Sequence, residues 1–327
     1  SVAISINGSE RETHMKTIIL VTGSTAIDQT GNYDGSFEEY QASYPTKAFN
    51  VSFQLADMRS SFGGCAPNIA HGLTQLGIEA IPLSSAGRNF VDQYRAHLIN
   101  LGINIDFIAV ADDVASCASC MMINDAHGNQ IIGFYPGPDN PGRQSPETLP
   151  FIDNIVLTIL GPEEPELTLR QGRILFEHNV PLMVDPGQVI AAFSRDQIRE
   201  LLMLARYLVI NHHEFEVLKT NGGLTDEEIF SQVPEVILTR GDKGVTIYSR
   251  EAICHVEAVP DVEVAEVTGC GDAFRAGYAY GIVNHLNLAK RGQAGCIMAA
   301  RNLENPETQR YRMTATELAR LQTEIYG

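Results

Sequence analysis

The sequence predicts an α/β fold in which helices cover both faces of a mostly parallel central sheet that carries a small β-sheet lid. After residue 150, short apolar and β-branched runs alternate with segments of helical periodicity, as in parallel strands joined by crossover helices. Before it, two irregular stretches, about residues 30–62 and 107–136, contain short β-like runs and turns. We expect these two stretches to form the lid of a single domain over residues 15–327.

The composition restricts the possible partners. The chain has 327 residues, is 44% hydrophobic and carries a formal net charge of −17 at pH 7. Nucleic acids and anionic membranes attract basic surfaces, so this charge argues against both as partners. The apolar runs are shorter than the roughly 20 residues that a membrane-spanning helix needs. We therefore expect a cytoplasmic protein.

The first expected element is a strand over residues 17–27. The residues before it, 1–14, are polar and lack the apolar stretch of a secretory signal, so we expect them to be a non-native extension ahead of a start at Met15. Ser24 and Asp28 stand at the end of this strand. Open α/β sheets bind ligands at the carboxyl ends of their strands, so both are candidate binding residues.

The two irregular stretches flank a glycine turn and a helix. Residues 30–62 show no long helical pattern, and Gly63-Gly64-Cys65-Ala66-Pro67-Asn68 then leads into apolar residues at helical spacing. The second stretch contains β-like runs over residues 118–123 and 130–135, on either side of a turn. These runs are the expected lid strands.

The rest of the chain alternates regularly between strands and helices. The expected strands are residues 155–160, 181–184, 207–210, 236–239 and 244–248. The expected helices lie near residues 167–177 and 195–203, from Glu214 onward, and after Gly271 and Leu288. No repeat or long linker interrupts this pattern, which predicts one domain.

The strongest chemical signal is the stretch Thr268-Gly269-Cys270-Gly271-Asp272-Ala273-Phe274, which opens an expected helix. Free N–H groups at a helix N-terminus bind anions, and glycines let a phosphate approach the backbone. For the glycines alone a helix-capping turn is the favoured explanation, but Asp272 favours a kinase. Its carboxylate suits a base that accepts the proton of a hydroxyl, while the backbone of residues 269–271 stabilises the transferred phosphoryl group. We expect the helix terminus to lower the pKa of Asp272.

Four motifs in this order resemble those of the ribokinase-like (PfkB) family of carbohydrate and nucleoside kinases. They are Gly63-Gly64…Asn68, Asn211-His-His-Glu214, Thr239-Arg-Gly-Asp-Lys-Gly244 and Thr268-Gly-Cys-Gly-Asp272. The resemblance covers about residues 15–327 and implies a ribokinase-like three-layer sandwich with a β-sheet lid. Within the family, residues 21–28, 63–70, 134–137 and 271–277 look like the prokaryotic adenosine-kinase branch.

The resemblance also implies roles for individual residues. In the catalytic centre, Asp272 is the base and the backbone of Gly269, Cys270 and Gly271 is the anion hole. Asp28, Gly64 and Asn68 hold the ribose hydroxyls, Phe134 stacks on the base, and Ser24 is a further polar candidate at the strand end. Asn211, Thr239, Gly241 and Gly244 line the ATP site, and Glu214 orders Mg²⁺, through water because Mg²⁺ dehydrates reluctantly.

Two departures from the family pattern bear on these roles. Glu266-Val267 stands where relatives have an acidic residue followed by threonine, which argues against the monovalent cation that many relatives hold near this loop. Cys120 and Met121 stand where an aromatic partner for the base is expected, which leaves nucleosides other than adenosine open.

The leading hypothesis is the transfer of the γ-phosphoryl group of ATP, with Mg²⁺, to a nucleoside 5′-hydroxyl, with adenosine the favoured acceptor. A sugar kinase of ribokinase or fructokinase type is the alternative, since Asp28 and Asn68 suit any polyol. A non-catalytic nucleoside sensor is a third reading, against which the intact Asp272 argues. The unpaired edges of a small sheet also predict a homodimer that forms through the lid.

Overall fold

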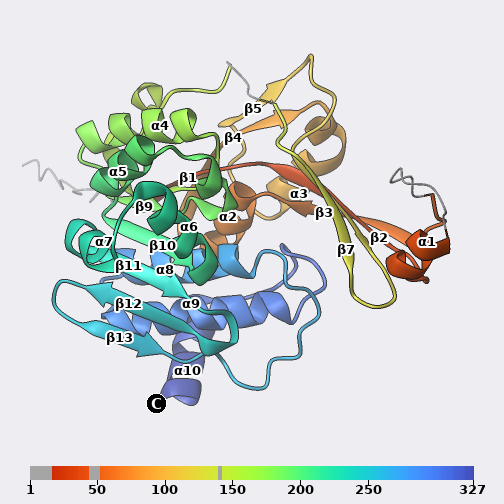
Figure 1. Cartoon of the computed structure of the whole chain (residues 1–327). Helices are drawn as coiled ribbons and strands as arrows, with labels where there is room; N and C mark the ends of the chain where they lie inside the picture. The colour runs from red at the N-terminus through yellow and green to blue at the C-terminus, as the bar shows by residue number, and fades with distance from the viewer. Residues whose placement is uncertain (1–16, 44–51, 139–141) are drawn as a thin grey trace, which may run out of the picture.

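The computed structural model describes residues 17–43, 52–138 and 142–327. The expected extension over residues 1–14 and the expected start at Met15 lie outside these ranges. Figure 1 shows a large sheet between two layers of helices, with a small sheet that projects from one side. No helix in the described ranges is long and apolar enough to cross a membrane.

The large sheet has nine strands in the order β13-β12-β11-β10-β9-β8-β1-β4-β5. The pairs from β5 to β11 are parallel, and β12 and β13 add an antiparallel hairpin at one edge. Its strands are β1 (Ile18–Thr22), β4 (Glu79–Gly87), β5 (Ile108–Ala111), β8 (Ile155–Leu160), β9 (Leu182–Val184), β10 (Tyr207–Asn211), β11 (Glu235–Thr239), β12 (Val245–Ser249) and β13 (Ile253–Val256). The predicted mostly parallel sheet is confirmed.

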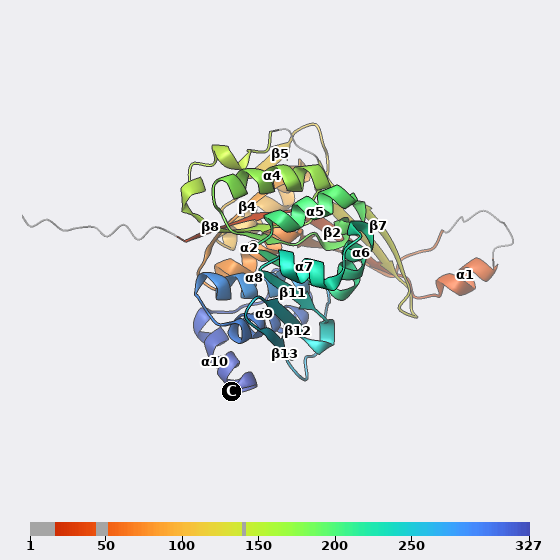
Figure 2. The same cartoon turned by 60° about the vertical axis from the view of Figure 1, so that its left-hand side comes forward.

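Helices cover both faces of this sheet, as Figures 1 and 2 show. One layer contains α2 (Cys65–Gln75), the π-helical turn η1 (Phe90–Tyr94), α3 (Arg95–Asn100), α8 (Cys270–Val283) and α9 (Leu288–Leu303), with α10 (Ala315–Tyr326) packed on α9. The other layer contains α4 (Pro165–Glu177), α5 (Arg195–Leu204), α6 (His212–Gly222) and α7 (Asp226–Gln232). Short 3₁₀ turns are η2 (Pro146–Thr148), η3 (Ile152–Asn154), η4 (Gly187–Ala192) and η5 (Gly241–Lys243).

Alternation along the strands produces the two cores. In β1, Ile19 and Val21 pack against the layer with α2 and α8, whereas Ile18 and Leu20 pack against the layer with α4 and α5. Successive side chains of a strand point to opposite faces, so a strand covered on both sides is apolar throughout. All five residues of β1 are buried accordingly.

The lid is a four-stranded sheet in the order β3-β2-β6-β7. Its strands are β2 (Ala26–Asn32), β3 (Asp57–Gly63), β6 (Ser119–Asn124) and β7 (Gln130–Tyr135). The short helix α1 (Phe37–Ser43) lies at its far end (Figures 1 and 2).

The structure differs from the expected elements at three points. The expected strand over residues 17–27 is two strands in different sheets, because the chain turns at Gly23, whose φ of 139° is in the region that favours glycine. Residues 37–43 form a helix within a stretch in which no long helical pattern was apparent. Residues 108–111 join the large sheet, so the second lid segment begins at Ser119 rather than near residue 107.

Candidate active site

The turn between β3 and α2 brings the lid against the large sheet. Gly64 has a φ of 94°, and a Cβ atom there would lie 2.3 Å from the carbonyl oxygen of Ser24. A Cβ atom at Gly63 would lie 2.5 Å from Oδ2 of Asp28. Only glycine permits both approaches, so the pair fixes the distance between Asp28 and the start of α2.

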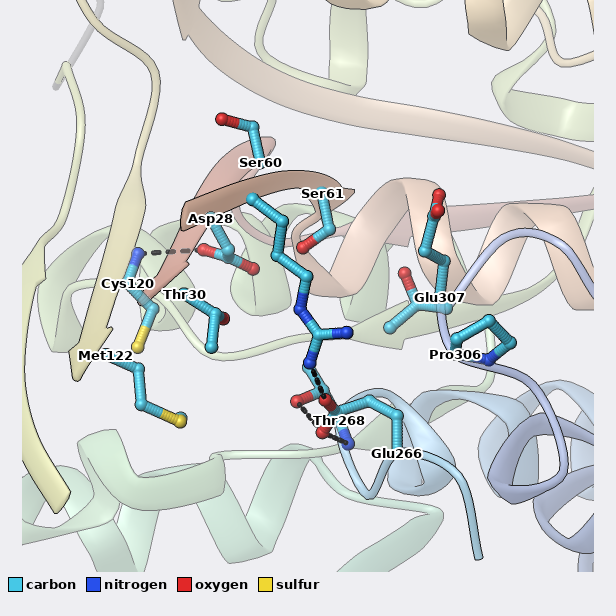
Figure 3. Close-up of a pocket in the computed structure, with 12 residues that line it drawn as sticks. Asp28, Thr30, Ser60, Ser61, Cys120, Met122, Glu266, Thr268, Pro306 and Glu307 are labelled. Atoms are coloured by element: carbon cyan, nitrogen blue, oxygen red, sulfur yellow. Dashed lines mark hydrogen bonds and ion pairs between the residues drawn. The ribbon is translucent and has the colours of Figure 1, made fainter. Parts of the chain in front are cut away.

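Asp28 projects from β2 into a pocket between the lid and the body (Figure 3). Its Oδ1 accepts a hydrogen bond of 2.8 Å from the Cys120 N–H, and burial raises its pKa although this bond lowers it. The lid side of the pocket includes Asp28, Thr30, Arg59, Ser61, Cys120 and Met122, and the body side includes Glu266, Thr268, Glu307 and Thr308. The pocket is therefore polar on both sides, with two sulfur-containing side chains on β6.

Asn68 and Asp272 meet although 204 positions separate them in sequence. Asn68 lies in the first turn of α2 and Asp272 in the first turn of α8, and Nδ2 of Asn68 donates to Oδ2 of Asp272 at 2.8 Å. Burial raises the pKa of Asp272 to about 6, although the bond from Asn68 and the charge of Arg275 lower it. The expectation of a lowered pKa was wrong, because the removal of the carboxylate from water outweighs the helix terminus.

The loop before α8 turns at Gly269. Gly269 has a φ of 76° and precedes the helix, and a Cβ atom there would lie 2.6 Å from Cγ2 of Thr308. The side chain of Asn302 anchors the loop by donating to the Thr268 carbonyl at 2.8 Å. The Cys270 N–H makes a long contact of 3.4 Å with the Val267 carbonyl. The N–H groups of the first helical turn have no acceptors within the helix, and that of Cys270 is already engaged by this contact.

An ion pair that the sequence did not reveal lies beside this loop. Arg275, on α8, forms a hydrogen-bonded ion pair with Asp185, which follows β9. Nη1 of Arg275 also donates to the Gly271 carbonyl at 2.9 Å, and a Cβ atom at Gly271 would lie 2.8 Å from that nitrogen. Asp185 and Arg275 are 90 positions apart in sequence, so only the packing of α8 against the large sheet brings them together.

The residues expected to line an ATP site lie at the carboxyl ends of two neighbouring strands. Asn211 ends β10 and Thr239 ends β11, and the two residues are paired in register. Gly241 and Gly244 bound the turn after β11, with φ angles of 59° and 74°. A Cβ atom at Gly244 would lie 2.0 Å from the Val256 carbonyl oxygen, so this turn requires glycine.

Glu214 and Asn211 have a structural role that is visible without any ligand. They form a capping box at the start of α6: the Glu214 N–H donates to Asn211 Oδ1 at 2.9 Å, and Glu214 Oε2 accepts from the Asn211 N–H at 3.0 Å. Burial raises the pKa of Glu214. The capping box uses one carboxylate oxygen, so the second is available to accept from a water molecule bound to Mg²⁺. In the described ranges, no group of three or more His, Cys, Asp or Glu side chains is arranged to hold a metal ion.

Two residues that we expected to bind the phosphoryl acceptor lie outside this arrangement of side chains. Phe134 is 65% exposed on β7 and does not line the pocket, although it is paired with Cys120 and therefore lies on the same face of the lid. Ser24 contributes its carbonyl group, which accepts from the Ala66 N–H at 3.4 Å. The sequence interpretation missed Arg59 and Thr308, since neither belongs to a recognisable motif.

Comparison with known proteins identifies the family of the chain. The family model described as pfkB family carbohydrate kinase matches residues 16–314. A nucleoside kinase of Methanocaldococcus jannaschii is 27% identical over 283 residues, which is 86% of this chain and 89% of the relative.

Solved structures show the same fold. The nucleoside kinase of Burkholderia thailandensis in complex with inosine is 31% identical, with a TM-score of 0.83 over 94% of this chain and 99% of that one. Arabidopsis thaliana ribokinase, complexed with ribose and ATP, is 17% identical and shares the fold, with a TM-score of 0.76 over 94% of this chain and 99% of that one. The chain therefore belongs to the pfkB family of carbohydrate kinases, with a ribokinase-like fold and a reaction that transfers a phosphoryl group to a hydroxyl acceptor.

Proposed function

We propose that this protein transfers the γ-phosphoryl group of ATP to the 5′-hydroxyl of a nucleoside, with adenosine the favoured acceptor. The hydrogen bond between Asn68 and Asp272 is the observation that carries the proposal, because it joins a residue suited to bind ribose to a residue suited to accept a proton. The similarity to two nucleoside kinases, one of them solved with inosine, supports a nucleoside as the acceptor.

In this proposal Asp272 acts as the base. Its carboxylate accepts from Asn68 through Oδ2 and interacts with the Cys65 thiol, and in the proposal it also accepts from the acceptor hydroxyl. The hydroxyl oxygen forms a bond to the γ-phosphorus, the bond to the bridging oxygen of ADP breaks, and the hydroxyl proton passes to Asp272. A pKa of about 6 means that the carboxylate is mostly ionised at neutral pH and is a stronger base than an exposed aspartate.

The anion hole and the nucleotide site supply the electrostatic part of the mechanism. The backbone at Gly269, Cys270 and Gly271 faces the transferred phosphoryl group, while Asn211, Thr239, Gly241 and Gly244 line the ATP site. When bound, Mg²⁺ neutralises phosphate charge, and Glu214 holds it through water. A monovalent cation is not part of the proposal, because the Glu266 carboxylate already contacts the guanidinium of Arg59 at 3.5 Å and accepts from its own loop.

The lid supplies recognition of the nucleoside. Asp28 accepts hydrogen bonds from the ribose diol, and its burial beside the backbone of Gly63 favours neutral hydroxyl donors as partners. The base lies over β6, where Cys120 and Met122 face the pocket, and the exposed ring of Phe134 stacks on it when the lid closes.

A substrate panel tests the proposal. ADP formation from ATP and Mg²⁺ is measured with adenosine, inosine, ribose and fructose at matched concentrations, and the expected result is the highest kcat/KM with adenosine. Turnover of ribose or fructose alone would assign the protein to the sugar kinases instead. Binding of nucleoside without ADP formation would identify it as a sensor.

The proposal includes a homodimer formed through the outer face of the lid. Met58, Met121 and Tyr135 are 64%, 55% and 43% exposed on the face opposite to Asp28. A second lid would cover these side chains and protect the edges of a four-stranded sheet. Light scattering at several protein concentrations is expected to show a dimer for the wild type and a monomer for the Met58→Glu, Met121→Glu double variant.

A further inference from the structure

We propose that Gln309 is a positioning residue that fixes the orientation of the Asn68 amide and so keeps an N–H donor directed at Asp272. The inference rests on the proposed role of Asp272 as base. Gln309 lies in the loop between α9 and α10, 241 positions from Asn68 and outside all four family motifs, and it is 4% exposed. Its function would be to set the protonation equilibrium of the base without touching either substrate.

The first link is the hydroxyl group of Tyr94. It donates to the Gly63 carbonyl at 3.0 Å, and burial raises the pKa of the phenol, so the proton stays on Tyr94. Because that proton is committed to Gly63, the Tyr94 oxygen can only accept from Gln309. It does so from Nε2 of Gln309.

The second link is the carbonyl end of Gln309. Oε1 lies 3.0 Å from Nε2 of His97, and burial lowers the pKa of His97, so a neutral ring with its proton on Nε2 suits this contact. Tyr94 and His97 thus hold opposite ends of the Gln309 amide. An amide with an acceptor at its nitrogen and a donor at its oxygen has one favoured orientation.

The orientation of Gln309 determines that of Asn68. Nε2 of Gln309 donates its second proton to Asn68 Oδ1 at 2.8 Å. The Asn68 oxygen is therefore occupied, and Nδ2 points at Oδ2 of Asp272 at 2.8 Å. An N–H donor stabilises the ionised carboxylate, whereas a reversed Asn68 would present its oxygen and stabilise the protonated acid.

Several other groups interact electrostatically with Asp272. They are Cys65, Tyr94, Asp185, Cys270, Arg275 and Tyr311. Of these, only Tyr94 is also hydrogen-bonded to Gln309. A neutral substitution at Gln309 leaves all six side chains in place and removes the hydrogen bonds of the Gln309 amide to Asn68, Tyr94 and His97. The pH dependence of turnover is therefore a specific readout of this link.

The test is the pH profile of kcat/KM for Gln309→Met, with Gln93→Met, an exposed residue of η1, as the matched control. A hydrogen bond to a charged group contributes enough to move a pKa by about one unit. The acid limb is expected to move upward by about that amount, so that kcat/KM falls about tenfold at pH 5 and little at pH 8. The control should keep the wild-type profile.

A merely structural role for Gln309 predicts a different result, in which kcat/KM falls by the same factor at every pH. That result, or a profile that coincides with the wild type, would overturn the proposal. If Gln309→Met loses the wild-type melting temperature, Tyr94→Phe provides the same test, because it removes the acceptor that holds Nε2. Its acid limb is expected to move in the same direction by a smaller amount.

The acceptor for these profiles is whichever compound of the substrate panel gives the fastest turnover. If the wild type phosphorylates only sugars, the nucleoside proposal is rejected. The pH profile then still has an acid limb, and its shift in Gln309→Met decides the role of Gln309. If the wild type phosphorylates no acceptor, the nucleoside proposal and the role of Gln309 are both rejected, because Asp272 then accepts no proton.

Discussion

Three carboxyl groups and one guanidinium group interact at the start of α8. Asp272 and Glu214 each feel the negative charge of Asp185 and the positive charge of Arg275, and burial raises the pKa of all three acids. A site with this surplus of negative charge opposes the approach of phosphate unless cations and N–H dipoles compensate. Arg275 is therefore as important to the electrostatics of the site as the glycines of the motif.

Asp272→Asn is expected to abolish turnover and to increase stability at neutral pH. The folded-state pKa of Asp272 is raised from 3.8 to about 6, so folding works against the ionised form. This penalty is absent below about pH 4, grows as the unfolded carboxyl ionises, and is complete above about pH 6. Two pKa units correspond to roughly 2–3 kcal/mol, of which we expect about 2 kcal/mol in the free energy of unfolding at pH 7.5.

Urea unfolding of both proteins at pH 4 and pH 7.5 measures this effect. The variant should exceed the wild type only at the higher pH. Equal stability at both values would show that Asp272 is not appreciably desolvated in the folded protein.

Arg275→Met is expected to destabilise the protein by about 3–5 kcal/mol, because it leaves Asp185 buried without its partner. Arg173→Met is the matched control. The Arg173 side chain is 42% exposed and pairs with Glu200, and such exposed pairs contribute about 0–1 kcal/mol. Denaturant midpoints give both values. A loss at Arg275 no larger than that at Arg173 would mean that the buried pair contributes no more than a surface pair.

At the scale of elements, the turn from β3 into α2 controls the position of Asp28. Gly63→Ala is expected to raise the KM for the acceptor about tenfold with little change in kcat, because the added methyl group would lie 2.5 Å from Oδ2 of Asp28 and displace the carboxylate. Gly133→Ala, in lid strand β7, is the control, since its nearest neighbour, Cε of Met121, would lie 3.9 Å from the new Cβ atom. Initial rates against acceptor concentration give both constants, and a KM for Gly63→Ala equal to that of the control would contradict the assignment of Asp28.

The sequence predicted the elements whose local signals are strong. The strands from β8 to β12 were predicted to within about two residues, because each strand is short, apolar and bounded by polar turns, whereas helix α7 was not predicted. The sequence did not predict that residues 17–27 are divided between two sheets, because the turn at Gly23 becomes apparent only when the strand pairings are known. Helix α10 and the hairpin strand β13 were not named in advance, although β13 is a short apolar run and α10 has apolar residues at helical spacing.

The candidate site was predictable where a sequence motif indicates a chemical role. Asp272 and its glycines were singled out from a local pattern and Asn68 from the family resemblance, and the structure brings Asn68 and Asp272 into contact. Gln309 and Arg275 were not found, because glutamine and arginine acquire their roles here only through contacts across the fold. The pKa of Asp272 was wrong in direction because desolvation depends on tertiary packing, which no local pattern contains.

At the scale of the whole molecule, the lid contacts the body at the mouth of the acceptor pocket. Arg59 on β3 approaches Glu266 at 3.5 Å, and Glu266 Oε1 accepts from the N–H groups of Val267 and Thr268 and from the Thr268 hydroxyl. Figure 3 shows Glu266 and Thr268 on the side of the pocket opposite to Asp28. The ion pair therefore connects a lid strand directly to the loop that precedes α8.

This connection predicts that Arg59→Gln and Glu266→Gln weaken closure of the lid over the acceptor. Each is expected to raise the KM for the acceptor about threefold, in keeping with the modest energy of an exposed pair, and the double variant should be no weaker than either single one. Raising the salt concentration should bring the wild type toward the variants, since salt screens exposed charges. Arg320→Gln with Glu324→Gln, an exposed ion pair on α10, controls for the change in surface charge. Additive effects of the two pocket substitutions would show that Arg59 and Glu266 act on the acceptor separately and that lid closure does not depend on their contact.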